Sequence, residues 1–146
     1  MAKLGKLGIQ VELKTPAREA FDFFMKNLGN LPQMLPETVQ SLEMLQGDLS
    51  TADSVMLLKY NLGAPMAAKI KINDLDKNQK MVTYEFIEGD VLKLYKSFTT
   101  KLQFADGYVT WEAGYEKVSE SAQNPDLCAS FAATLLTGMD KFLSKH

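Results

Sequence analysis

The chain has 146 residues and a formal net charge of −2, with 46% apolar and 23% charged residues. This composition is typical of one globular domain and excludes a disordered chain. Lysine and arginine form no cluster longer than a pair, so no basic surface for nucleic acid is expected. No run of about 18 apolar residues predicts a membrane span. We expect a single domain over residues 1–146, with no nucleic-acid or membrane partner.

The N-terminal part predicts a strand followed by helical segments. Apolar and polar residues alternate over residues 7–13, the pattern of a half-buried strand. Thr15 suits a helix N-cap, and Pro16 suits the first helical position. Apolar residues then recur at helical spacing until Gly29, which is expected to end the helix. Residues 31–36 allow only a short helical turn, because their final proline stops it.

Six further strands are predicted, each separated from the next by turn residues. Their spans are Val39–Gln46, Val55–Leu62, Ala67–Leu75, Met81–Glu88, Tyr95–Ala105 and Tyr108–Lys117. Asp106-Gly107 is the strongest turn signal and predicts a type I′ hairpin. Connections this short require antiparallel neighbours. A final amphipathic helix of about 20 residues is expected to begin at Asn124 or Pro125.

This order of elements predicts an α+β fold, with the helices on one face of an antiparallel sheet. Alternate side chains of the strands define the face that turns toward the long helix. Tyrosine and threonine hydroxyls lie among the apolar residues of that face, and a buried hydroxyl needs a partner. Two interpretations are open: a filled core with hydroxyls at its rim, or an apolar pocket with a few polar groups.

The inward face supplies the candidate site residues. Tyr84 and Tyr115 are the candidates for a catalytic hydroxyl, because tyrosine can donate to a carbonyl or enol oxygen. With a reference pKa of about 10, tyrosine is a poor base at neutral pH. Lys96 is included because the alternation of its strand places it inward, which is unusual for lysine. The expected ligand-binding residues are Met56, Leu58, Tyr60, Ile70, Val82, Phe86, Lys96, Phe98, Thr100, Leu102, Trp111, Leu135 and Met139.

The residue types present exclude several kinds of active site. His146 is the only histidine, and a chain end cannot hold a base firmly against a substrate. A Ser-His-Asp or Cys-His site is therefore not expected, and no metal or other cofactor is predicted. Cys128, the only cysteine, is expected to pack on the apolar side of the final helix. A single cysteine and no signal peptide indicate a cytoplasmic protein.

Two passages resemble the plant major latex proteins of the Bet v 1-like (PR-10) superfamily. One combines I-E-G-D at 87–90 with L-Y-K-S-F at 94–98, and the other is W-x-x-x-Y-E-K at 111–117. Gly5-Lys6-Leu7 and the order of elements over nearly the whole chain agree with this resemblance. It implies a helix-grip fold: a seven-stranded curved sheet around a long helix, a V-shaped pair of short helices, and a large internal hydrophobic cavity. It favours the pocket over the filled core.

The resemblance also implies a function. Family members bind hydrophobic plant metabolites such as steroids, cytokinins, flavonoids and alkaloids, and a few relatives close or isomerise reactive intermediates without a cofactor. This sequence departs from the family pattern at two places, which limits the family roles that can be assigned to its residues. Residues 46–53 contain one glycine where the family loop is glycine-rich, which weakens a phosphate-binding interpretation. The seventh strand has no inward lysine like that of the alkaloid-condensing enzymes.

The first functional hypothesis is therefore a binding protein for a hydrophobic plant specialised metabolite. The alternative is a cofactor-free cyclase or isomerase that steers a reactive intermediate to one stereochemical product. As the substrate of such an enzyme, an iridoid enol-type intermediate is favoured over an alkaloid intermediate. A ribonuclease or defence role is the third hypothesis, and the sequence offers neither a usable histidine nor a basic groove for it. The oligomeric state, monomer or weak dimer, is left open.

Overall fold

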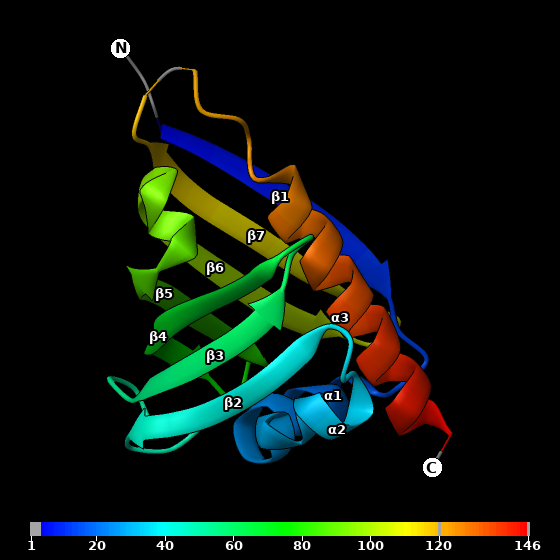
Figure 1. Cartoon of the computed structure of the whole chain (residues 1–146). Coiled ribbons are helices and arrows are strands. Elements are labelled where there is room, and N and C mark those ends of the chain that lie inside the picture. The colour runs from blue at the N-terminus through cyan, green and yellow to red at the C-terminus, as the bar shows by residue number, and fades with distance from the viewer. Residues whose placement is uncertain (1–3, 120, 146) are drawn as a thin grey trace.

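The computed structural model describes residues 4–119 and 121–145, so His146 lies outside the described residues. Seven strands form one sheet that curves around the long helix α3, Asp126–Ser144 (Figure 1). The strand order is β1-β7-β6-β5-β4-β3-β2, and every neighbouring pair is antiparallel. The strands are β1 Leu4–Glu12, β2 Val39–Gln46, β3 Val55–Asn61, β4 Pro65–Asp76, β5 Met81–Gly89, β6 Tyr95–Ala105 and β7 Tyr108–Lys117. The predicted α+β helix-grip fold is confirmed.

The hairpin between β6 and β7 turns at the predicted residues but in a different geometry. Gly107 has a φ of +97°, whereas Asp106 is not in the left-handed region, and a type I′ turn needs positive φ at both positions. The prediction of type I′ is therefore wrong. Glycine adopts the left-handed conformation without the steric cost that aspartate would meet. The Asp106 carboxylate instead accepts the backbone N–H of Ala17 at 3.1 Å, at the start of α1.

The helical chain between β1 and β2 changes type along its length. It consists of α1 Ala17–Asp22, a π turn at Phe23–Asn27, a 3₁₀ turn at Leu28–Asn30 and α2 Leu31–Met34. The prediction that Gly29 ends a regular helix is wrong, because helical turns continue through it. Phe23, Phe24 and Met25 are all buried, and three consecutive residues cannot share one face of a regular α-helix. The wider π turn accommodates all three.

Thr15 does not cap α1 as predicted, because its polar groups bond to α3. The Asp140 carboxylate accepts the backbone N–H groups of Lys14 and Thr15 at 2.8–3.0 Å. The Thr15 hydroxyl donates to the carbonyl oxygen of Asp140 at 3.4 Å. Burial alone would raise the pKa of Asp140, but these hydrogen bonds outweigh it and lower the pKa. An ionised Asp140 thus holds the C-terminal half of α3 to the segment that follows β1.

The interior lies between the concave face of the sheet and α3 (Figure 1). The helix α2 lies beside β2 and α3, and α1 lies beside β6. Aromatic rings close this end: Phe21 and Phe24 lie 6.2 and 5.3 Å from Phe104 of β6, measured between ring centroids. These ring contacts hold the helical turns before β2 against β6.

Candidate functional site

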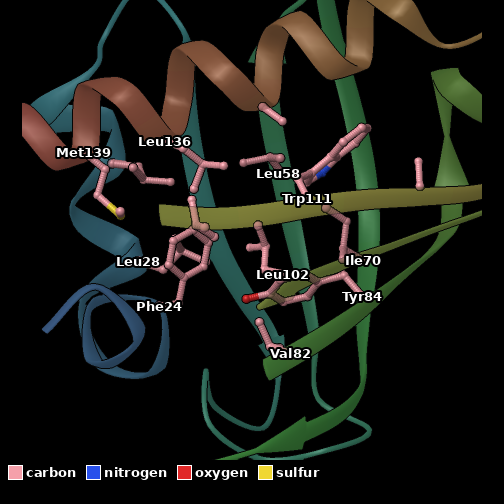
Figure 2. Close-up of a cluster of buried hydrophobic side chains, with 14 of the residues drawn as sticks. Phe24, Leu28, Leu58, Ile70, Val82, Tyr84, Leu102, Trp111, Leu136 and Met139 are labelled. Atoms are coloured by element: carbon pink, nitrogen blue, oxygen red, sulfur yellow. The ribbon is translucent and has the colours of Figure 1, made fainter. Parts of the chain in front are cut away.

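An apolar cavity of about 120 Å³ lies between the sheet and α3. Strands β2 to β7, the helical turns before β2, and α3 all contribute to its walls, and Figure 2 shows part of the lining. The lining residues are Phe24, Leu28, Leu31, Leu42, Met56, Leu58, Tyr60, Leu62, Ile70, Tyr84, Phe86, Phe98, Thr100, Leu102, Trp111, Cys128, Phe131, Ala132, Leu135 and Leu136.

Most of the predicted site residues lie in this lining, because the strands alternate as expected. The predicted residues that line the cavity are Met56, Leu58, Tyr60, Ile70, Tyr84, Phe86, Phe98, Thr100, Leu102, Trp111 and Leu135. Val82 and Met139 are completely buried but belong to the packed core outside the lining. Ligand binding by these lining residues stays a prediction.

The prediction that Lys96 points inward is wrong. The pairing of β6 with β7 shifts register between Tyr95 and Ser97, which makes Lys96 an extra residue and interrupts the alternation. Tyr95 is consequently buried, whereas the Lys96 side chain is 56% exposed and its Nζ lies 3.7 Å from Glu116 Oε2. The structure places Lys96 outside the cavity lining.

Tyr115 is buried but is also outside the lining. Its hydroxyl donates to the Asn124 side-chain oxygen at 3.2 Å. Its ring lies against Gly5 of β1, where an added Cβ would approach the ring to 2.5 Å. The neighbouring Tyr95 hydroxyl donates to the carbonyl oxygen of Gln123 at 2.7 Å. Both hydroxyls therefore hold the loop that precedes α3, and a catalytic role of Tyr115 remains an untested prediction.

The predicted site set omitted several lining residues, most of them from helices. Their signals were present in the sequence: Phe24 and Leu28 recur at helical spacing, and Cys128 and Phe131 belong to the apolar stripe of the last helix. Ala132 and Leu136 lie one helical turn apart on that same helix. The remaining omitted residues are Leu31, Leu42 and Leu62.

The polar groups of the lining are few and uncharged. They are the hydroxyls of Tyr60, Tyr84 and Thr100, the Cys128 thiol and the Trp111 indole N–H, and no charged side chain of the described residues lines the cavity. Burial raises the pKa values of Tyr60 and Tyr84, and it raises the pKa of Cys128 to about 11. These groups are therefore protonated at neutral pH.

Tyr84 differs from the other polar groups in one respect. Its hydroxyl oxygen is the one buried side-chain nitrogen or oxygen of the described residues that has no hydrogen-bond partner. A buried group left unpaired in this way costs about 1–3 kcal/mol. Such a group in a native fold needs a physical explanation.

The cavity is smaller than the resemblance implied. Ligand pockets usually have roughly 300–1,000 Å³, against about 120 Å³ here. An engineered cavity of about 150 Å³ in another protein admits benzene. The space fits a compact ring, and a larger ligand requires the lining to move. The described residues contain no group of three His, Cys, Asp or Glu arranged for a metal ion, and none of the described helices could span a membrane.

A curved antiparallel sheet gripping a long helix, with an apolar cavity between them, defines a class of proteins that enclose hydrophobic ligands. The chain belongs to the pathogenesis-related protein Bet v 1 family, whose model matches residues 2–146. Members of this family bind hydrophobic ligands.

Several of the individual relatives are named as major latex proteins. MLP-like protein 43 of Arabidopsis thaliana is 27% identical over 96% of this chain and 93% of its own length. MLP-like protein 34 of the same plant is 28% identical, and this chain spans 46% of its length. The crystal structure of major latex-like protein 151 from Panax ginseng matches with a TM-score of 0.92 and 25% identity, covering 95% of this chain and 97% of that chain. The predicted resemblance is confirmed.

Norcoclaurine synthase from Thalictrum flavum has the same fold at lower identity. The TM-score is 0.80 with 17% identity, over 98% of this chain and 88% of that chain. This likeness shows the fold alone.

Proposed function

We propose that the protein binds a compact hydrophobic plant metabolite in the cavity between the sheet and α3. The cavity itself carries the proposal, because protein interiors are otherwise close-packed. The cavity of about 120 Å³ leaves a mostly apolar lining without packing partners, and a bound apolar ligand would supply them. Membership of a family of hydrophobic-ligand binders supports the same function.

The residues of the lining also limit the charge that the ligand can carry. Because no charged side chain of the described residues lines the cavity, an ionised ligand would be buried without a counter-charge. The ligand is therefore neutral, and its binding uses neither a metal nor another cofactor. The unpaired Cys128 thiol fits the cytoplasmic location that the sequence predicts.

Filling the cavity should abolish binding. Ala132 lines the cavity from α3, and Ala132→Leu adds carbon atoms to that space. We expect toluene, a neutral ring of suitable size, to bind the wild-type protein and to bind Ala132→Leu at least about tenfold more weakly. The thermal unfolding temperature of the variant should stay level or rise, because a void is filled. Isothermal titration calorimetry and thermal denaturation measure the two effects.

The matched control is Ala133→Leu, the same substitution at the next position of α3, which does not line the cavity. Toluene affinity should be unchanged in this variant. Failure of toluene to bind the wild-type protein, or equal losses in both variants, would contradict the proposal.

Native mass spectrometry of the purified protein is a separate measurement, which would identify a ligand carried from its source.

A second candidate function is a cofactor-free cyclase or isomerase. The observation that favours it is the protonated, unpaired Tyr84 hydroxyl beside an apolar cavity. Holding one folded conformer and excluding water can direct a reaction that is already fast in water. An iridoid enol-type intermediate is the leading substrate class, ahead of an alkaloid precursor.

The test is product stereochemistry when the iridoid intermediate is generated in the same vessel. We expect the wild-type protein to enrich one isomer, and Ala132→Leu to return the ratio toward that of the reaction in buffer. Chiral gas chromatography measures the ratio. An identical ratio with and without wild-type protein would remove this candidate and leave the binding function untouched.

A further inference from the structure

The unpaired hydroxyl of Tyr84 gives information about the ligand that the cavity volume does not. The ring lines the cavity, and the hydroxyl oxygen is buried without a partner among the described residues. Figure 2 shows this oxygen turned toward the interior of the cluster, on the side of Leu102 and Phe24. Because burying an unpaired hydroxyl is unfavourable, the position calls for a partner that the chain does not supply.

The packing at this position does not require a hydroxyl. Phe86 lies two residues along β5 and lines the same cavity with a plain ring, 5.1 Å from the ring of Phe98. Two other buried tyrosines use their hydroxyls structurally: Tyr95 bonds to Gln123 and Tyr115 bonds to Asn124. The Tyr84 hydroxyl is thus the exception among these three tyrosines.

The surroundings of Tyr84 define what its partner can be. Its strand neighbours in register are Ile72 on β4 and Thr100 on β6, and both side chains are uncharged. Burial raises the pKa of Tyr84, so the hydroxyl keeps its proton and is able to donate it in a hydrogen bond. An ionised carboxylate or ammonium group would find no opposite charge in this lining.

Resting on the proposed binding function, we propose that Tyr84 donates a hydrogen bond to a neutral carbonyl oxygen at one end of a compact apolar ligand. A carbonyl oxygen has acceptor sites only, so one donor satisfies it. An alcohol would bring its own hydrogen, which would then need a second buried partner. The same contact would orient a reactive carbonyl or enol-derived intermediate in the cavity.

Two probes of nearly the same shape isolate this hydrogen bond: cyclohexanone and methylenecyclohexane. Tyr84→Phe removes the donor and keeps the ring. We expect this variant to bind cyclohexanone about tenfold more weakly, while its affinity for methylenecyclohexane is unchanged. Isothermal titration calorimetry gives both constants. Tyr108→Phe is the matched control, because Tyr108 is partly exposed and outside the cavity lining, and it should alter neither constant.

The infrared carbonyl band of bound cyclohexanone provides a readout in the wild-type protein itself. A hydrogen bond from Tyr84 should lower the frequency of this band, and the shift should disappear in Tyr84→Phe. An unshifted band in the wild-type protein would overturn the inference without any variant. So would a loss of ketone preference in Tyr60→Phe in place of Tyr84→Phe.

The outcomes separate this inference from the function on which it rests. If the wild-type protein binds both probes and Tyr84→Phe weakens both equally or neither, the binding function stands and the role of Tyr84 is refuted. If neither probe binds the wild-type protein, both proposals are refuted. Selective loss of cyclohexanone binding supports both.

Discussion

Three buried tyrosines show how the partner of a hydroxyl decides what the residue does. Tyr95 and Tyr115 lie ring against ring, with centroids 5.4 Å apart, and both donate to the loop before α3. Burial raises the pKa of Tyr95 to about 12, so this hydroxyl is a donor throughout the physiological range. Tyr84 has the same chemistry but no partner. The first two therefore stabilise the fold, and the third is the hydroxyl that we propose as a donor to a ligand.

Removing the hydroxyl of Tyr115 should affect stability and not ligand preference. Tyr115→Phe loses the hydrogen bond to Asn124 and keeps the ring against Gly5, so a loss of about 1 kcal/mol in unfolding free energy is expected. Asn124→Ala should cost a similar amount, and the double variant should cost less than the sum. Urea denaturation measures all three. Unchanged stability together with lost binding or turnover would instead favour the predicted catalytic role.

For single residues, the sequence predicts which side of the sheet a side chain faces, and little more. Alternation placed Tyr84 and Tyr115 inward correctly. It could not identify the partner of Tyr115, because Asn124 comes from a loop with no periodic pattern. It also failed for Lys96, since a single extra residue in β6 reverses the alternation locally and leaves no mark in the composition.

The helix α3 is held near both ends by contacts with distant elements. Near its start, the loop carrying Gln123 and Asn124 is bonded to strands β6 and β7 through tyrosine hydroxyls. Near its end, Asp140 accepts the amides that follow β1. The cavity lies under the turns between these two attachments, where Cys128, Phe131 and Leu135 face the sheet. A ligand larger than the present cavity would have to displace this middle section.

The attachment through Asp140 should make stability depend on pH. Its pKa is lowered in the folded state relative to about 3.9 in an unfolded chain. The stabilisation is therefore fully present above about pH 4 and is lost as the pH falls through the folded-state pKa. Asp140→Asn should lower the unfolding free energy at pH 7 by about 1–3 kcal/mol. Its stability should also fall less than that of the wild type between pH 5 and 2, measured by urea midpoints. Parallel pH curves for the two proteins would contradict this role.

The strands were predicted more accurately than the helices, for a physical reason. In a strand with one solvent-exposed face and one buried face, polar and apolar residues alternate with a period of two. The strands β2, β6 and β7 have the predicted bounds. The segment from α1 to α2 has to bury Phe23, Phe24 and Met25 together, which no regular helical period describes. Its π turn packs Phe24 against Phe104 of β6, and its 3₁₀ turn lies beside β2.

For the whole molecule, sequence pattern and resemblance predict the architecture but not the volume enclosed. An amphipathic sheet and an amphipathic helix indicate which faces meet, and the gap between them depends on side-chain conformations across six strands and α3. The resemblance implied a large cavity, whereas the space is about 120 Å³. The ligand class that we propose therefore rests on geometry, above all on the unpaired Tyr84, and alternation could not predict it.

The strand order has a consequence for how the chain folds. The strand β1 pairs only with β7, so that Leu4 lies opposite Glu116. Thr15 likewise meets its partner Asp140 across 125 positions of sequence. Contacts between such distant positions are costly in loop entropy and form late. On the ribosome, the meander from β2 to β7 can assemble while α3 is still being synthesised. The first strand must wait until β7 has emerged, and the cavity closes only when α3 packs against the sheet.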